Sequence, residues 1–361
     1  MPEPTPPKLP ERDGPLPDLA SLCDFEEAAP LRTFLLDPRV AEVMVNGPEQ
    51  VYIEREGRLQ LSPAAFDAEQ LERLIERIVS TCGRDLSERQ PYADVRLADG
   101  TRIVALIKPV ALRGPYLNIR RFSRTILTMD DLVRLESITL EAATCLQTCV
   151  RERANVIIGG PSSAGKTTLL NILLECIPQE ERVVAIEHSS ELALLDGHHM
   201  VCLETRRANL EGQGEITVRE LLQTTLLIRP DRIIIGEVRG PEAFDFVQAM
   251  SSGHEGSITT VHGRSGEEAL FRLQAMALLG GVHYSSEAMT RLLLSTVDLI
   301  VQLQRTHEGG RYVSGIFEVN LGADLAASLT PVFLREDHPD SPGVLKPTGV
   351  IPRCLRPLHL P

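Results

Sequence analysis

The sequence has no tryptophan, few other aromatic residues and no long apolar run, and each shortage excludes a class of protein. Aromatic residues make up 4% of the 361 residues, which leaves few platforms for stacking nucleic-acid bases. No apolar run reaches the ~18 residues of a transmembrane helix, and the first residues lack the basic-plus-apolar pattern of a secretory signal peptide. We therefore expect a cytoplasmic protein that is peripheral at the inner membrane, held there only through partners.

Net charge and cysteine usage narrow the choice further. The formal net charge of −13 argues against a broad duplex-binding surface, so no direct nucleic-acid partner is expected, although a local basic groove stays open. None of the seven cysteines forms a CxxC pair, which is typical of a reducing compartment. Cys145 and Cys149 would share a helix face; without a second ligand pair, ordinary buried thiols are favoured over zinc ligands.

One stretch fits the pattern G-x-x-x-x-G-K-[ST] of a phosphate-binding P-loop. An apolar run, 155–158, precedes it as a buried strand, and a helical segment, 169–177, follows it, which is the context that the motif requires. The residues that we expect to bind nucleotide here are Gly160, Pro161, Ser162, Ser163, Ala164, Gly165, Lys166, Thr167 and Thr168.

The chemistry of a P-loop assigns these residues their roles. Glycines allow backbone N–H groups to converge on phosphate oxygens, and the following helix adds positive potential at its N-terminus. Lys166 can reach the β- and γ-phosphates, and the Thr167 hydroxyl can coordinate Mg²⁺. The expected cofactors are therefore ATP and Mg²⁺.

The order of strands and helices predicts an α/β protein with a smaller α+β domain in front. Residues 1–18 are rich in proline and are expected to be a disordered tail. Residues 19–124 show a helix, two strands, an amphipathic helix and further strands. Residues 125–139 form a linker, and alternating strands and helices then predict a P-loop ATPase domain, 140–361. Its last thirty residues are expected to wrap the surface.

Acidic and histidine residues follow the apolar strands of this second domain. Glu237 ends the run Arg232–Glu237 and is a candidate for orienting Mg²⁺ or the attacking water. Glu187 and Glu191 leave an earlier strand, where two carboxylates suit metal coordination and water activation. His254 and His262 flank a strand and could contact a γ-phosphate. The P-loop upstream favours a functional role for Glu237 over an exposed glutamate at a strand end, whereas the glutamate pair and each histidine, taken alone, would more often be structural.

Taken together, the motifs resemble those of the type II/type IV secretion ATPase superfamily, whose members are hexameric motors with a RecA-like ATPase domain. The motifs run in the order P-loop, IExxxEL, RPDRIIIGEVRG and GHEGSITTVH, and similar signals upstream extend the resemblance over about residues 31–320. Within the superfamily the sequence looks most like the CpaF-type ATPases of Tad pilus systems. In this sequence His188 stands where the family usually has an aspartate beside the first glutamate.

The resemblance implies roles for further residues. It places Glu187 and Glu191 in an acidic box with Glu191 as general base, Glu187 and Glu237 with Thr167 at the metal, and His254 and His262 in a histidine box. It counts Lys166 and His262 with the two glutamates Glu191 and Glu237 as catalytic. The arginines that it implies near the nucleotide, some of them acting across subunit borders, are Arg120, Arg121, Arg206, Arg229 and Arg239.

The leading hypothesis is thus a hexameric ATPase motor that powers pilus assembly or protein secretion, with inner-membrane platform proteins as partners. A nucleic-acid motor on the same core is disfavoured by the acidic charge and the scarce aromatics. A nucleotide-dependent scaffold with little turnover is suggested only by His188, and the retained glutamates oppose it. The sequence contains no LSGGQ-like signature of a transporter subunit.

Overall fold

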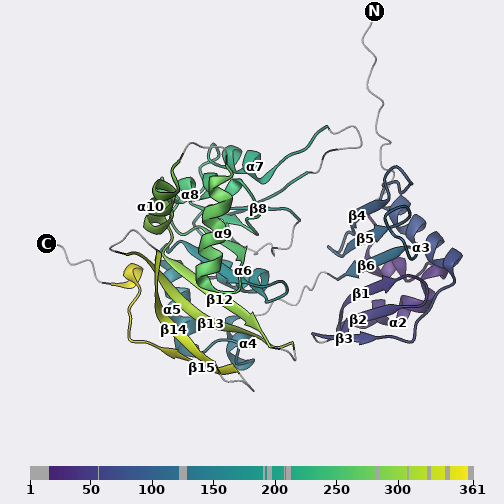
Figure 1. Ribbon diagram of the computed structural model, residues 1–361, viewed down its shortest axis with the longest axis horizontal. Helices are drawn as coiled ribbons and strands as arrows, with labels where there is room; N and C mark the ends of the chain where they lie inside the picture. Colours follow the sequence, from purple (N-terminus) through teal and green to yellow (C-terminus); the bar gives the residue numbers. More distant parts are fainter. Residues whose placement is uncertain are drawn as a thin grey trace, which may run out of the picture. The chain divides into compact units, whose positions relative to one another are not determined.

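The computed structural model describes residues 16–55, 57–121, 128–189, 192, 197–206, 208, 213–280, 284–306, 309–322, 327–337 and 342–356. The chain divides into two compact units, residues 1–124 and 125–361 (Figure 1). Most of the proline-rich tail expected at 1–18 lies outside the described residues. No helix among the described residues is long and apolar enough to cross a membrane.

The first unit is an antiparallel sheet covered by helices. Its six strands pair in the order β3-β2-β1-β6-β5-β4. The long helix α3 buries apolar residues at helical spacing against this sheet, and the side chain of Asp67 caps it by accepting a hydrogen bond from the backbone N–H of Gln70. The elements are α1 (Leu19–Leu22), η1 (Glu26–Leu31), α2 (Arg32–Leu36), β1 (Val40–Asn46), β2 (Val51–Arg55), β3 (Arg58–Leu61), α3 (Ala68–Thr81), β4 (Tyr92–Arg96), β5 (Arg102–Leu106) and β6 (Tyr116–Arg120).

The second unit is built on a mixed sheet of nine strands, in the order β15-β14-β13-β12-β7-β11-β10-β8-β9. The strands from β12 to β9 in this order are parallel, and the strands from β13 to β15 are antiparallel. The strands are β7 (Val156–Gly160), β8 (Val183–Glu187), β9 (Met200–Glu204), β10 (Arg232–Ile235), β11 (Ile258–His262), β12 (Leu299–Arg305), β13 (Arg311–Leu321), β14 (Ala327–Asp337) and β15 (Pro342–Pro347).

Helices cover both faces of this sheet, which confirms the α/β class expected from the alternating pattern (Figure 1). One core lies against α4, α5 and α6, and a second lies against α7, α8, α9 and α10. Because both faces are covered, the central strands are apolar throughout. The helices are α4 (Met129–Arg134), α5 (Leu140–Arg151), α6 (Lys166–Leu174), α7 (Val218–Thr225), α8 (Glu242–Ser251), α9 (Gly266–Leu278) and α10 (Ser286–Thr296); the short η2 (Arg353–Leu355) follows the last strand.

The C-terminal region differs from the expectation that it wraps the surface. β14 and β15 extend the sheet beyond β13 by antiparallel pairing. Met129, within the segment expected to be a linker, belongs to the core of the second unit together with Ile138. β14 and β15 each pair with the strand that directly precedes them in the chain, so their place in the sheet follows from packing against a neighbouring strand and not from their own residue pattern.

Candidate active site

The P-loop connects the central strand β7 to helix α6. β7 is buried along its whole length and lies between β12 and β11. Gly165 has a φ of 93°, in the left-handed region that favours glycine. A Cβ added at Gly160 would lie 3.2 Å from both the Cβ of Ala164 and the backbone oxygen of Leu303. The glycines therefore allow the tight turn that aims the first amides of α6 toward a bound anion.

The side chain of Lys166 folds back onto the loop. Only 8% of the residue is exposed. Its Nζ donates to the backbone oxygens of Gly160 at 3.1 Å and Pro161 at 3.0 Å, and it lies 3.2 Å from Nδ1 of His262. These acceptors hold the ammonium group beside the loop, and a phosphate that engages Lys166 must replace some of them.

Glu237 and His262 meet at the same edge of the sheet. Glu237 follows β10, and His262 is the last residue of β11, where it lies opposite Gly160 in the parallel register. Nε2 of His262 is 2.6 Å from Oε1 of Glu237. The other carboxylate oxygen, Oε2, accepts from Nε of Arg239 at 2.5 Å. The tertiary fold thus links Lys166, His262, Glu237 and Arg239 in one polar chain beside the P-loop.

The environment of His262 favours its neutral form. Partial burial lowers the pKa of His262 below its ordinary value of 6.5, and the nearby Lys166 ammonium lowers it further, against the opposing effect of Glu237. A neutral ring protonated on Nε2 can accept from Lys166 through Nδ1 and face Glu237 with its N–H. His262 is thereby suited to connect the phosphate-binding lysine with the acidic residue.

The first glutamate of the acidic box lies one strand farther away. Glu187 ends β8, is 4% exposed, and its Oε1 accepts from the backbone N–H of Leu192 at 2.8 Å. A Cβ added at Gly236 would lie 3.3 Å from Cγ of Glu187, so the glycine before Glu237 makes room for this side chain. Glu191, the expected general base, lies outside the described residues.

The donors present fit a magnesium ion held largely by nucleotide phosphates. Thr167 and Thr168 are half-buried in the first turn of α6. Among the residues that the structure describes, no group of three His, Cys, Asp or Glu side chains could hold a metal by itself. A threonine hydroxyl plus phosphate oxygens and water is the donor set that Mg²⁺ commonly takes in such sites. Thr167 would hold the ion, with Glu237 and Glu187 near the same edge.

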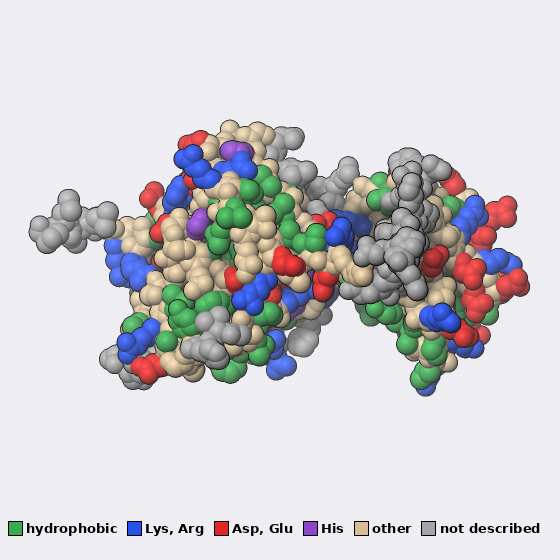
Figure 2. All heavy atoms as spheres, turned by 90° about the horizontal axis from the view of Figure 1, so that it is seen from above, with side chains coloured by type: hydrophobic (Ala, Val, Ile, Leu, Met, Phe, Trp, Pro, Cys, Tyr) green, Lys and Arg blue, Asp and Glu red, His purple; other side chains and the backbone are tan. Residues whose placement is uncertain are grey.

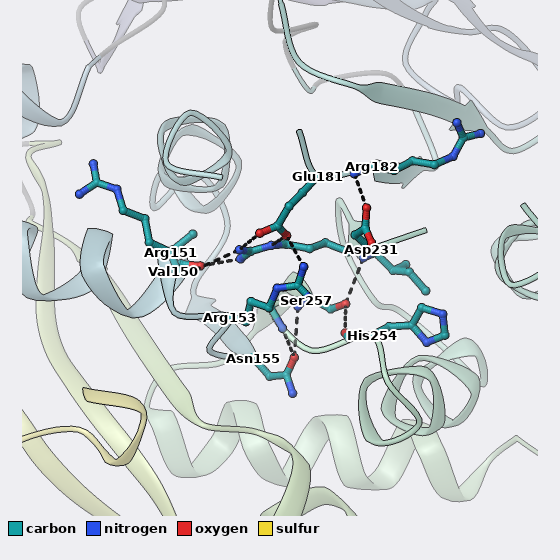
Figure 3. Close-up of polar contacts among 12 residues, drawn as sticks. Val150, Arg151, Arg153, Asn155, Glu181, Arg182, Asp231, His254 and Ser257 are labelled. Atoms are coloured by element: carbon teal, nitrogen blue, oxygen red, sulfur yellow. Dashed lines mark hydrogen bonds and ion pairs between the residues drawn. The ribbon is translucent and has the colours of Figure 1, made fainter. Parts of the chain in front are cut away.

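His254 lies at the opposite end of the sheet from the P-loop. It precedes β11, its Nδ1 lies 3.1 Å from the backbone oxygen of Ala249, and its own carbonyl accepts from Oγ of Ser257 at 2.7 Å (Figure 3). The neighbouring Asn155 accepts from the backbone N–H of Ser257 just before β7 begins. The P-loop follows the other end of β7, so the structure does not bring His254 together with Lys166 and His262 within one chain.

The expected arginines are placed in different surroundings, and only Arg239 contacts the acidic group beside the P-loop. Arg120 ends β6 with an exposed side chain. Nη2 of Arg121 donates to the backbone oxygen of Leu35 at 2.5 Å. Arg206 donates through Nε to Gly214 O at 2.5 Å. Arg229 is exposed, with a φ of 58°.

The model of the family described as Type II/IV secretion system protein matches residues 24–310. The chain belongs to this family. It is 34% identical over 282 residues, 76% of this chain and 79% of the relative, to a putative conjugal transfer protein of Mycobacterium tuberculosis. It is 31% identical over 317 residues to the type IV secretion system protein VirB11 of Brucella suis, and the match covers 80% of this chain and 88% of that relative. The Yersinia pseudotuberculosis ATPase DotB has the same fold, at a TM-score of 0.59, 18% identity, and coverage of 84% of this chain and 82% of that one.

With its intact P-loop and the acidic and histidine residues gathered around it, this member of the Type II/IV secretion system family is an ATP hydrolase.

The sequence patterns did not single out one buried charged group, the guanidinium of Arg232. Arg232 is fully buried, and the carboxylate of Glu181 accepts hydrogen bonds from its Nε at 2.6 Å and its Nη2 at 3.1 Å. The only signal in the sequence was an arginine at the head of an apolar strand.

Proposed function

We propose that this chain is a hexameric ATPase motor of a type II/IV secretion system and that it powers pilus assembly or protein secretion across the inner membrane. The observation that carries the proposal is the polar chain of Lys166, His262 and Glu237 beside a glycine-shaped P-loop. Such a chain connects the group that holds phosphates to a carboxylate able to orient water. A motor needs this connection because the change from bound ATP to bound ADP must change the conformation of the protein around the nucleotide.

Each residue of the site has a separate task in this proposal. Amides of the loop and Lys166 bind the phosphates, and Glu237 or Glu191 orients and deprotonates the attacking water. A magnesium ion, held through Thr167, would neutralise charge on the phosphate oxygens. His262 contacts both Lys166 and Glu237, so a shift of Lys166 on phosphate binding would change the surroundings of Glu237 through His262.

The proposal includes a ring in which neighbouring subunits complete the sites. Arginines supplied in trans commonly stabilise the charge of a transferring phosphoryl group. Arg120 has an exposed side chain at the end of the last strand of the first unit, and Arg239 already contacts Glu237. Arg206 and Arg229 are exposed and are further candidates. In the cell, the ring would be cytoplasmic and peripheral at the inner membrane, bound to platform proteins.

Within the family we propose a pilus system of the Tad type, supported by the combination of IExxxEL, RPDRIIIGEVRG and GHEGSITTVH with the upstream signals. A nucleic-acid motor is disfavoured by the net charge of −13. On the face drawn in Figure 2, lysine and arginine side chains are scattered among acidic and apolar ones and form no continuous basic surface.

The test measures ATP turnover and oligomeric mass of the full chain together, with and without ATP and Mg²⁺. We expect ATP hydrolysis that rises with assembly into rings, and loss of turnover and weaker nucleotide binding in Lys166→Ala. The control is Lys346→Ala, which removes an exposed lysine paired with Glu336. Near-normal turnover in folded Lys166→Ala, or full activity of a strict monomer, would contradict the proposal. Salt-sensitive stimulation by DNA would favour the nucleic-acid motor instead.

A further inference from the structure

The hairpin of β12 and β13 lies along one side of the P-loop. β12 runs parallel to β7, with Gln302 opposite Gly159, so both strands end at the same edge of the sheet. Leu303 then lies against the first glycine of the loop, Gly160. Because ligands of open α/β sheets bind at the carboxyl ends of their strands, the tip of this hairpin borders the nucleotide site.

Arg311, the first residue of β13, extends its side chain over the loop. A Cβ added at Gly165 would lie 3.5 Å from Cδ of Arg311, and Gly165 directly precedes Lys166. Arg311 is exposed, and Arg305 lies opposite it in the antiparallel register. The guanidinium of Arg311 beside a phosphate-binding loop is the kind of planar donor that binds phosphate oxygens through charge-assisted hydrogen bonds.

The backbone of Arg311 is held from several directions. The hydroxyl of Ser137 donates to the carbonyl of Arg311 at 2.7 Å, and the backbone N–H of Val313 donates to Ser137 O at 2.8 Å. The buried guanidinium of Arg335 donates to Val313 O at 3.0 Å and to Ser137 O at 3.2 Å. The backbone at the tip of the hairpin is fixed in this way, so a ligand that binds Arg311 needs to order only its side chain.

The two sides of β7 carry different chemistry. Glu237 and His262 come from β10 and β11, on one side of β7, and they mark the side where the γ-phosphate reacts. Arg311 comes from the side of β12 and β13. A nucleotide seated on the loop would direct its reacting end toward the first side, which leaves the second side to the portion that ATP and ADP share.

We propose that Arg311 is a nucleotide-binding residue that holds the shared portion of ATP and ADP, on the side of the P-loop away from the γ-phosphate. The inference rests on the proposed ATPase function and deepens it. A residue that binds substrate and product alike contributes uniform binding, which changes KM but not kcat. Arg311 is in this respect unlike Lys166, whose charge is needed at the reacting phosphates.

The test compares Arg311→Ala, Arg311→Lys and the control Arg291→Ala, which removes an exposed arginine of α10. We expect Arg311→Ala to raise the Kd for ADP and the KM for ATP by similar factors of about 10, the loss expected for a charge-assisted hydrogen bond. Its kcat at saturating ATP should stay within about 2-fold of the wild type. Arg311→Lys should recover part of the affinity, because it keeps the charge.

The outcomes separate this inference from the proposed function. If Arg311→Ala binds ADP as tightly as wild type while Lys166→Ala does not, the assignment of Arg311 is wrong and the ATPase function stands. A lower kcat with unchanged Kd for ADP would place Arg311 at the γ-phosphate and also overturn the assignment. If the wild-type chain itself neither binds ADP nor hydrolyses ATP, the proposed function fails first. Thermal unfolding of each variant shows whether a loss reflects misfolding.

Discussion

Nε2 of His262 lies 2.6 Å from Oε1 of Glu237, although helix α8 separates the two residues in the chain. Parallel pairing of β10 with β11 brings the two side chains to one edge of the sheet. Thr260 strengthens this arrangement, since its hydroxyl donates to Gly236 O at 2.8 Å and its carbonyl accepts from the backbone N–H of Val238. These hydrogen bonds hold the segment that carries Glu237 against the strand that carries His262.

Glu237→Gln should bind ATP and hydrolyse it slowly, by ~10²-fold or more, because a carboxylate that orients water is lost while the side-chain volume is kept. Single-turnover hydrolysis and ATP affinity are the measurements, and ATP-bound oligomers should accumulate. Glu191→Gln is the matched comparison. If Glu191→Gln is severely impaired and Glu237→Gln is not, the general base belongs to the acidic box.

Turnover should depend on pH through His262. Because burial and Lys166 lower its pKa below the ordinary 6.5, the ring is neutral at pH 7 and protonates only in more acid solution. The proton would place a second positive charge beside Lys166, so kcat should be flat near neutrality and fall at acid pH.

His262→Asn should reduce turnover at pH 7 and remove this acid limb. An acid limb that is unchanged in His262→Asn would assign it to another group.

The lowered pKa of His262 also affects stability, because the unfolded chain takes up this proton at a higher pH than the folded chain does. The free energy of unfolding should therefore decrease as the pH falls from 6.5 toward the lowered pKa of His262.

Mixed rings test whether arginines act in trans. The mixture contains Lys166→Ala subunits, which keep their arginines, and Arg120→Ala/Arg121→Ala subunits, which keep their P-loop. If the arginines act across a border, mixing should restore some activity that neither variant shows alone. If they act within their own chain, mixing should restore none.

The structure also sharpens the choice of variants for that experiment. Arg121 donates a hydrogen bond to Leu35 O, so its removal would destabilise the first unit. The exposed side chain of Arg120 can be removed with less effect on folding. Arg120→Ala alone is thus the cleaner partner for Lys166→Ala. Thermal unfolding of each unmixed variant shows which of them stays folded.

Arg232→Met should destabilise the second unit by ~3 kcal/mol, because it removes the buried guanidinium and leaves Glu181 with only the more exposed Arg153 as its ion-pair partner. Nη1 of Arg232 also donates to Val150 O at 2.5 Å, so this guanidinium ties the end of α5 to the start of β10. Urea unfolding measures the loss. Arg291→Ala, at an exposed ion pair with Glu287, should change stability by less than ~1 kcal/mol.

The double variant Arg232→Met/Glu181→Leu should recover part of the stability, since both charges of the pair are then removed and only the exposed Arg153 loses a partner. A single variant as stable as the wild type would show that the pair contributes nothing. The pair lies at the amino ends of β8 and β10, whereas the P-loop follows the carboxyl end of β7, so the single variant isolates stability from catalysis.

The sequence by itself determined the features that depend on neighbouring residues. The spacing of glycines and lysine in 160–168 identified the P-loop, and the helical spacing of apolar residues predicted the amphipathic helix of the first domain, which is α3. These signals are local, because a turn or an amphipathic helix is specified by residues only a few positions apart. The family resemblance added expected roles for individual residues, but it gave no distances between them.

The tertiary structure alone decided which of those residues meet. It joined His262 to Glu237 and brought Arg311 over Gly165. It also added β14 and β15 to the sheet where proline-rich sequence suggested a surface strap. Strand order depends on how crossovers and burial place segments far apart in the chain, so a sequence pattern does not reveal which strand ends become neighbours.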